Sequence, residues 1–359
     1  MRAARVVVVG AGVGGLAAAL DHAARGFEVQ VLERAAAVGG KMRQVEAGSA
    51  RIDAGPTVLT MRWVFEALFQ SAGLSFADRV PLAQAAVIAR HAWTDGSRLD
   101  LHADLARSAA AIDAFCGEGE RFLAFAARAR GIYETLEGPF IRQACASPFA
   151  LMRAVGFTRL RELWRITPFA SLMRALGGHF RDPRLRQLFG RYATYCGSSP
   201  FLAPATLMLV AHVEQDGVWF VDGGMHRLAQ ALAEAARERG TTFRFGAEVA
   251  EVTTAHGRAS GVRLADGSTI DADAVVLNAD GAAVAAGLFG APAARAAPAA
   301  RGAVRSLSAL TWLAHARCEG FPLHRHNVFF ATDYRREFDD ILGHGRAPTE
   351  PTVYVCAQD

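Results

Sequence analysis

The stretch VVVVGAGVGG at residues 6–15 decides the fold of this chain. Four consecutive valines predict a parallel strand that is buried on both faces. Gly10 permits the tight turn that follows, Gly12 lets a phosphate approach the backbone, and Gly15 allows the next helix to pack closely on the sheet. The helix is expected to begin at Gly14 and to direct its free N–H groups at the phosphates. The stretch therefore predicts a dinucleotide-binding turn.

A second strand and a second glycine pair follow in the stretch EVQVLERAAAVGGK at residues 28–41. The strand ends at Glu33, about 20 residues beyond the glycines, where a carboxylate accepts hydrogen bonds from ribose hydroxyls. Arg34 comes next, and Lys41, the only lysine in the chain, stands beside the pair Gly39–Gly40. A glycine-rich turn in some other α/β protein is the alternative, but the elements occur in the order that a nucleotide site requires. The second glycine pair favours FAD over NAD.

Length and composition narrow the class of protein. A chain of 359 residues predicts two domains. The arginines are spread along the sequence and balanced by 35 acidic residues, so no nucleic-acid partner is expected. The sequence has no run of 18 uncharged apolar residues, so no transmembrane helix is expected. The five cysteines have no C-x-x-C spacing and are expected to be free thiols in a reducing cytoplasm.

A metal site is not expected either. His324 and His326 could be two ligands on one strand face. No third ligand stands at a suitable spacing, so both are expected to be surface histidines.

The pattern along the chain predicts an α/β fold whose nucleotide-binding domain is split in the sequence. A Rossmann-like, FAD-binding parallel-sheet domain is expected from residues 1–60 and 217–285. The inserted substrate domain, mixed helical and β, is expected from residues 61–216 and 286–359, and faces the membrane. Within it, residues 104–189 have mostly helical spacing with proline breaks, and Ser308–Ala316 is expected to be a strand.

The sequence resembles the bacterial carotenoid desaturases of the phytoene-desaturase type, within the FAD-dependent amine oxidase superfamily. The resembling segments are residues 6–15, 32–43, 53–57, 217–232 and 275–280. The stretch IDAGPT with MRWVF nine residues on is similar to the 1-hydroxycarotenoid 3,4-desaturases, also called methoxyneurosporene dehydrogenases, of purple photosynthetic bacteria.

The resemblance implies roles for particular residues. The two glycine segments and Lys41 would hold the FAD diphosphate, with Arg43 close by, and Glu33 would hold the adenosine ribose. Val249 would flank the adenine. The remaining implied cofactor contacts are Gly55, Pro56 and Thr57 near the isoalloxazine ring, and Asn278, Ala279 and Asp280 at the end of a later strand. The motif Gly223-Gly224-Met225 is left open between a helix cap and a cofactor contact.

The resemblance also implies a reaction. The substrate would be an acyclic, 1-hydroxylated carotenoid, from which two hydrogens leave the C3–C4 bond, the hydride going to flavin N5. No paired carboxylates and no His–Asp arrangement stand out, so the catalytic residues stay unknown. The electron acceptor stays open between oxygen and quinone. Phytoene desaturase, carotenoid isomerase and other flavin amine oxidase relatives are alternatives, as is a non-catalytic protein of the same fold that escorts a lipid.

Because such a substrate dissolves only in lipid, the chain is expected to be peripheral on the cytoplasmic face of the inner or intracytoplasmic membrane. Residues 149–180 have the pattern of a basic amphipathic helix that could lie among the headgroups. Family members usually continue beyond the length seen here, with a further glycine-rich segment against the flavin. The chain is therefore expected to be a fragment, or to have an incomplete flavin site.

Overall fold

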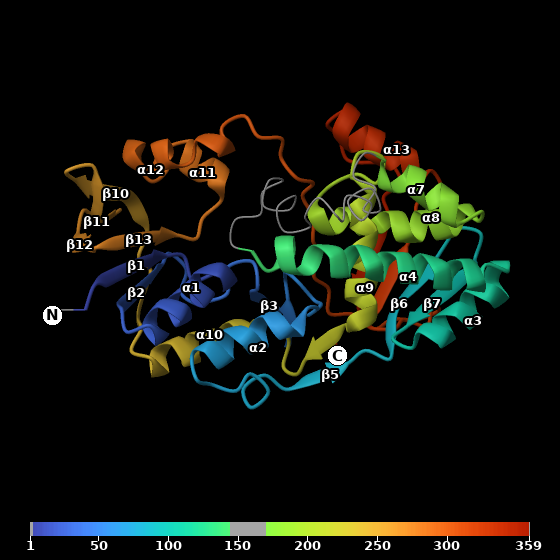
Figure 1. Ribbon diagram of the computed structural model, residues 1–359, viewed down its shortest axis with the longest axis horizontal. Coiled ribbons are helices and arrows are strands. Elements are labelled where there is room, and N and C mark those ends of the chain that lie inside the picture. The colour runs from blue at the N-terminus through green and yellow to red at the C-terminus, as the bar shows by residue number, and fades with distance from the viewer. Residues whose placement is uncertain (1–2, 144–169, 359) are drawn as a thin grey trace, which may run out of the picture. The chain divides into compact units, whose positions relative to one another are not determined.

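The computed structural model describes residues 3–143 and 170–358 (Figure 1). The chain divides into two compact units. The first comprises Met1–Ala83, Trp219–Arg305 and Thr311–Ala316, and the second comprises Gln84–Val218, Ser306–Leu310 and Arg317–Asp359. Residues 61–83, 286–305 and 311–316, which the sequence pattern placed in the inserted domain, lie in the first unit.

A four-stranded parallel sheet forms the centre of the first unit. Its strands are β13 (Ala274–Leu277), β1 (Arg5–Val9), β2 (Glu28–Glu33) and β9 (Thr242–Phe245), in that order across the sheet. The valines of β1 are all buried, as four consecutive apolar residues predict. The two outer strands, β9 and β13, come from residues more than 200 positions after the central strands β1 and β2. The predicted split, parallel nucleotide-binding sheet is therefore confirmed.

Three helices bury one apolar face of this sheet. They are α1 (Val13–Ala24), α2 (Arg62–Ser71) and α10 (His226–Glu238). Helix α1 packs against α10. Leu16, Phe69 and Leu228 lie together in one core and are fully buried. This shared core explains why residues 61–83 belong with the first unit, since Phe69 of α2 has its apolar partners there.

Smaller elements complete the first unit. They are the hairpin β3 (Gln44–Ala47) and β4 (Ala50–Asp53), the antiparallel sheet β10 (Val249–Ala255), β11 (Arg258–Leu264) and β12 (Thr269–Asp271), and the helices α11 (Gly281–Ala285), α12 (Gly290–Ala296) and the 3₁₀ turn η5 (Pro298–Ala300). The chain leaves the first unit through β5 (Leu82–Gln84) and returns through β8 (Trp219–Val221).

A mixed sheet underlies the second unit, with the strand order β15 (Val353–Cys356), β14 (His326–Phe329), β6 (Val87–Ala92), β7 (Arg98–His102). Strands β14 and β6 are parallel, and the outer pairs are antiparallel. The helices are α3 (Leu105–Cys116), α4 (Gly119–Leu136), η1 (Glu137–Ile141), α7 (Leu172–His179), α8 (Pro183–Gly190), η3 (Arg191–Cys196), η4 (Ala205–Met208), α9 (Leu209–Asp216), α13 (Tyr334–Phe338) and η6 (Asp339–Gly343). The predicted mixed helical and β character is confirmed.

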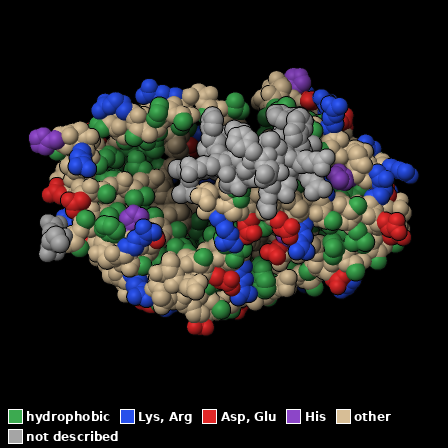
Figure 2. Space-filling view, in the orientation of Figure 1, with side chains coloured by type: hydrophobic (Ala, Val, Ile, Leu, Met, Phe, Trp, Pro, Cys, Tyr) green, Lys and Arg blue, Asp and Glu red, His purple; other side chains and the backbone are tan. Residues whose placement is uncertain are grey.

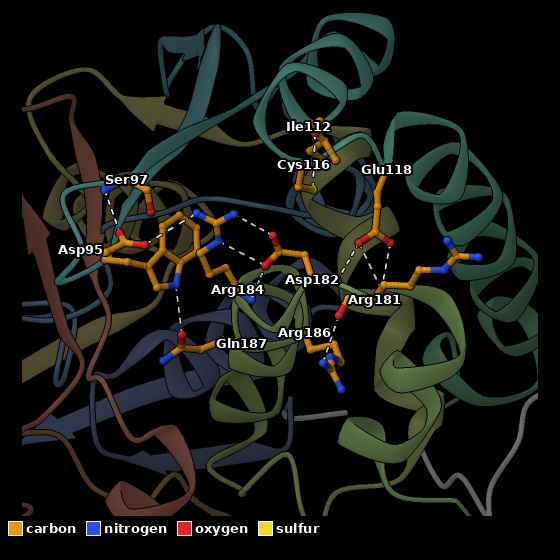
Figure 3. Close-up of polar contacts among 11 residues, drawn as sticks. Asp95, Ser97, Ile112, Cys116, Glu118, Arg181, Asp182, Arg184, Arg186 and Gln187 are labelled. Atoms are coloured by element: carbon orange, nitrogen blue, oxygen red, sulfur yellow. Dashed lines mark hydrogen bonds and ion pairs between the residues drawn. The ribbon is translucent and has the colours of Figure 1, made fainter.

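Helix α8 is fixed at its start by the polar network drawn in Figure 3. Asp182 is its N-cap and accepts a hydrogen bond from the backbone N of Arg184 at 2.8 Å. The buried carboxylate of Glu118 accepts from the backbone N of Arg181 at 2.9 Å and of Asp182 at 2.6 Å. Further along α8, Gln187 donates to the carbonyl of Ala331 at 2.8 Å. The network thereby fixes the position of the residues that follow α8.

Histidine 91 in β6 makes the second unit sensitive to acid. It is fully buried, and burial, aided by the charge of Arg191, lowers its pKa to about 3. The pKa of His91 in the folded state lies below its unfolded value of 6.5. The contribution of the neutral imidazole to the free energy of unfolding is therefore fully present above pH 6.5 and is lost as the pH falls toward 3. We expect the free energy of unfolding to fall as the pH drops from 7 to 5, by about 1.4 kcal/mol per pH unit for each proton that only the unfolded state binds.

Replacing the ring with a neutral amide tests this acid sensitivity. In His91→Gln, the pH slope of the free energy of unfolding between pH 7 and 5, from urea titrations, should be shallower than in the wild type. Some slope should remain, because the pKa of His326 is also lowered by burial, to about 4. An unchanged slope in the variant would contradict the role of His91.

Two expectations from the sequence are wrong. Ser308–Ala316 is not a strand: no neighbouring strand among residues 3–143 and 170–358 pairs with it, and Leu310 and Trp312 are each 84% exposed. His326 is not on the surface but 3% exposed in β14, which the sequence pattern did not predict. His324 pairs instead with Asp100 at 3.4 Å, so the two histidines have different partners.

The structure describes only a small part of the segment that the sequence predicts to contact the membrane. The predicted amphipathic helix spans residues 149–180, and its residues 149–169 lie outside the described residues. None of the helices in the described part combines the length and apolar character needed to cross a bilayer. Figure 2 shows acidic and basic side chains interspersed over the described part of the face in view, without one continuous basic surface.

Candidate functional site

The glycine turn after β1 has the close backbone packing that its spacing predicts. Gly10 has a φ of +97°, a conformation that side chains rarely adopt. A Cβ on Gly15 would overlap the carbonyl oxygen of Gly10, so α1 can approach β1 only because this residue is glycine. Gly12 is the N-cap of α1, no side chain caps the helix, and its first turn has no acidic residue. Its positive end is therefore left available for an anion.

Glu33, at the end of β2, contacts the glycine turn directly. Its carboxylate is 8% exposed and accepts a hydrogen bond from the backbone N of Ala11 at 2.7 Å and from that of Ala35 at 2.8 Å. A carboxylate has about four acceptor positions, so two bonds leave capacity for ribose hydroxyls. Arg34, the next residue, is exposed.

The second glycine pair lies against the first glycine segment. The backbone N of Gly39 donates to the carbonyl of Ala11 at 2.8 Å, and a Cβ on Gly40 would lie 3.1 Å from the Cα of Gly12. A Cβ on Gly55 would overlap the carbonyl oxygen of Lys41. The fold thus brings three separate glycine segments into direct contact. Of the other predicted contacts beside them, Lys41, Arg43 and Pro56 are exposed and Thr57 is half-buried.

Asn278 and Asp280 differ in what they contact. Asn278 donates from its side chain to the carbonyl of Gly10 at 3.3 Å, and a Cβ on Gly14 would lie 2.8 Å from its amide oxygen. Asp280 caps α11 and pairs with Arg305 at 2.7 Å; this pairing, with the Ala282 N–H and the charge of Lys41, lowers the pKa of Asp280 to about 2. Asn278 therefore belongs to the glycine turn, whereas the Asp280 carboxylate already has a cation and an N–H partner. Ala279 between them is exposed.

Val249 lies in β10 with its side chain in an apolar core. It is 7% exposed and clusters with Val7, Val9 and Leu32. Its predicted contact with adenine stays a prediction, and the side chain is already surrounded by these residues.

Two positioning residues were not predicted from the sequence. Asp53, at the end of β4 and 6% exposed, accepts from the backbone N of Met225 at 2.5 Å and of His226 at 3.3 Å, at the start of α10. The Nδ1 of His226 donates to the carbonyl of Met42 at 2.8 Å, because a carbonyl can only accept. Together they attach the start of α10 to the end of β4 and to Met42, the residue after Lys41. The sequence offered one indication of the role of Asp53, which is its position two residues before Gly55.

These residues fit the adenosine diphosphate half of FAD. The glycine segments form a surface without side chains, beside an uncapped helix N-terminus that favours phosphate. Glu33 lies where a ribose would be held, with acceptor capacity remaining.

Glu33→Gln should weaken FAD binding at least about 10-fold, which is the effect of one hydrogen bond to a charged group. The amide can accept only one of the two backbone N–H groups that the carboxylate accepts now. Titration of apoprotein with FAD, followed by quenching of flavin fluorescence, measures the change. Glu28→Gln is the matched control, since Glu28 begins the same strand with its side chain 53% exposed. Equal FAD affinity in the two variants would contradict the role of Glu33.

The sequence profile of a family described as flavin-containing amine oxidoreductase matches residues 13–313. The chain belongs to this family. Hydroxyneurosporene desaturase of Rubrivivax gelatinosus is 54% identical over 362 residues, which cover 100% of this chain and 69% of that protein. Hydroxyneurosporene desaturase of Cereibacter sphaeroides is 46% identical, over 99% of this chain and 72% of that protein. The predicted resemblance to carotenoid desaturases, the flavin cofactor and the oxidoreductase class are therefore confirmed.

Solved structures share the fold at low sequence identity. An oxidoreductase from Methanosarcina mazei has a TM-score of 0.53 and 18% identity, over 78% of this chain and 60% of that one. Rab GDI from Plasmodium falciparum has a TM-score of 0.51 and 11% identity, over 77% of this chain and 66% of that one. At such identities the comparison establishes the fold class only.

Proposed function

We propose that this chain is a FAD-dependent desaturase that acts on an acyclic, 1-hydroxylated carotenoid and introduces a double bond at C3–C4. The observation that carries the proposal is the 54% identity to a hydroxyneurosporene desaturase over the whole chain. The assembled glycine segments and the buried Glu33 support the same assignment, because they fit the adenosine diphosphate of the cofactor that such a reaction requires.

Each group in the first unit has a task in this proposal. FAD supplies the acceptor for a hydride from the substrate carbon. The α1 N-terminus and Lys41 bind the diphosphate, and Glu33 holds the ribose. Asp53 and His226 orient the segment that carries Lys41. We assign no catalytic base, because a cation next to a conjugated polyene is delocalised, and its proton can leave to a weak base or to water.

We assign the second unit to the substrate: residues 84–218, 306–310 and 317–359. The core of this unit is aromatic, with Phe122, Phe125, Phe180 and Phe189 packed against one another and each at most 4% exposed. A lipid-soluble substrate also supports a peripheral position on the cytoplasmic face of the inner or intracytoplasmic membrane. Co-sedimentation with anionic vesicles tests this position, and protein that stays in the supernatant would count against it.

The activity is tested by supplying 1-hydroxyneurosporene in lipid vesicles to the FAD-loaded protein, with oxygen or a quinone as acceptor. We expect the absorption bands of the polyene to shift to longer wavelength as conjugation extends. Lycopene and phytoene are the control substrates, since they lack the hydroxyl. Faster consumption of phytoene would favour a phytoene desaturase, and purified protein that takes up no flavin would favour the non-catalytic lipid-escort alternative.

A further inference from the structure

The second unit contains a group of charged and phenolic side chains, which we call the Arg191 cluster: Arg191, Tyr192, Tyr195 and Glu214. Tyr192 and Glu214 are buried, whereas Tyr195 is 49% exposed. The Arg191 guanidinium lies 3.5 Å from the Glu214 carboxylate, which accepts hydrogen bonds from the hydroxyls of Tyr192, at 2.7 Å, and Tyr195. The Glu214 carboxylate is thus paired with one cation and two hydroxyls, and the cluster has no net charge to offer a ligand.

Two further buried polar groups lie near this cluster and are unpaired. His91 donates from Nδ1 to the carbonyl of Leu99 at 3.3 Å, so its Nε2 carries a lone pair. Burial lowers the pKa of His91 and raises that of Tyr334, so the imidazole stays neutral and the phenol stays protonated. Within residues 3–143 and 170–358, neither His91 Nε2 nor the Tyr334 hydroxyl has a hydrogen-bond partner.

Both unpaired groups border the same aromatic ring. The ring centroids of His91 and Phe330 are 6.0 Å apart, and those of Phe330 and Tyr334 are 6.1 Å apart. The Tyr334 ring also lies 3.5 Å from where a Cβ of Gly190 would be, and Gly190 precedes Arg191. Further rings enclose the region: Trp93 stacks on Phe330, and Tyr334 contacts Phe338. The surroundings are aromatic, as an apolar chain requires.

One buried acceptor and one buried donor together match an alcohol. A hydroxyl group donates one hydrogen bond and accepts others, so it can donate to His91 Nε2 and accept from the Tyr334 hydroxyl. Buried polar groups are nearly always paired in folded proteins, so two unpaired ones that border the same ring indicate an absent partner. A carboxylate or an amine is a poorer match, because the nearby charges of Arg191 and Glu214 already neutralise each other.

We propose that His91 and Tyr334 form the subsite that binds the terminal hydroxyl of the polyene, and so select hydroxylated over unhydroxylated substrates. The proposal rests on the proposed function, which supplies the hydroxylated carotenoid. A site that hydrogen-bonds a hydroxyl discriminates against an analogue that lacks it, because the protein groups are then left unpaired.

Equilibrium binding of 1-hydroxyneurosporene and of neurosporene, partitioned from detergent micelles onto the full chain with FAD bound, tests this subsite. The wild type should prefer the hydroxylated carotenoid. Tyr334→Phe should reduce that preference about 10-fold, the effect of one hydrogen bond. Because it removes an unpaired buried hydroxyl, its melting temperature should not fall. Tyr133→Phe is the matched control: Tyr133 and Tyr334 are each 8% exposed, but the Tyr133 hydroxyl donates to Glu137 at 3.4 Å. The control should keep the preference of the wild type.

The outcomes separate this proposal from the proposed function. Equal preference in Tyr334→Phe and the wild type, or a wild type that does not distinguish the two carotenoids, would overturn the subsite. A wild type that prefers the hydroxylated carotenoid but does not desaturate it would overturn the proposed function and leave the subsite standing, provided that Tyr334→Phe loses the preference.

Discussion

Gly15→Ala is expected to yield a protein that retains no FAD and has lost about 3 kcal/mol of stability, because the new methyl group overpacks a close backbone contact. A Cβ at this position would overlap the carbonyl oxygen of Gly10, and the same contact lies between the glycine turn and α1. Relief requires α1 to move away from β1, and this movement displaces the helix N-terminus that would bind the diphosphate. Flavin absorbance of the purified variant and a urea titration measure the two effects.

Gly131→Ala is the control for this substitution. Gly131 lies inside α4, and a Cβ there would meet nothing within 4 Å. Alanine in a helix interior is more favourable than glycine by about 0.5–1 kcal/mol, so this variant should be slightly more stable and should bind FAD as the wild type does. Stoichiometric FAD in Gly15→Ala would show that the turn tolerates a side chain, contrary to the expected backbone overlap.

Glu214→Ala is expected to have a comparably large effect, on stability alone, of about 3–5 kcal/mol. The Glu214 side chain is 5% exposed and the Arg191 side chain 13% exposed, so the guanidinium would remain buried without its counter-ion. The Tyr192 and Tyr195 hydroxyls would lose their acceptor as well. Thermal unfolding followed by near-ultraviolet circular dichroism, which reports the packing of tyrosines, measures the change.

An exposed pair of the same residue types provides the comparison. Glu134 accepts from Arg130 at 2.7 Å, but the two side chains are 55% and 68% exposed. Glu134→Ala should therefore cost less than about 1 kcal/mol, as is usual for surface ion pairs. If both variants were destabilised equally, burial could not be the source of the Glu214 effect.

Much of the nucleotide site could be predicted from sequence because its parts are local. Gly10, Gly12 and Gly15 have their roles within one strand, turn and helix, and a buried run such as Val6–Val9 needs no distant information to be recognised. The strand pattern failed at Ser308–Ala316, where the residues have strand-like composition but no neighbouring strand in the described part of the chain. Periodicity describes the residues of a segment and contains nothing about its hydrogen-bonding partner.

The sequence by itself determined the dinucleotide turn, the acid after the second strand and the resemblance that led to a flavoprotein. Only the tertiary structure decided that Asp53 contacts the start of a helix that begins 173 residues later, and that Asn278 contacts a turn 268 residues before it. It alone placed His91 and Tyr334 against one ring, Phe330. Such contacts depend on how separate elements pack. A hydrogen bond forms only where packing brings donor and acceptor within about 3 Å, and spacing along one segment does not contain that information.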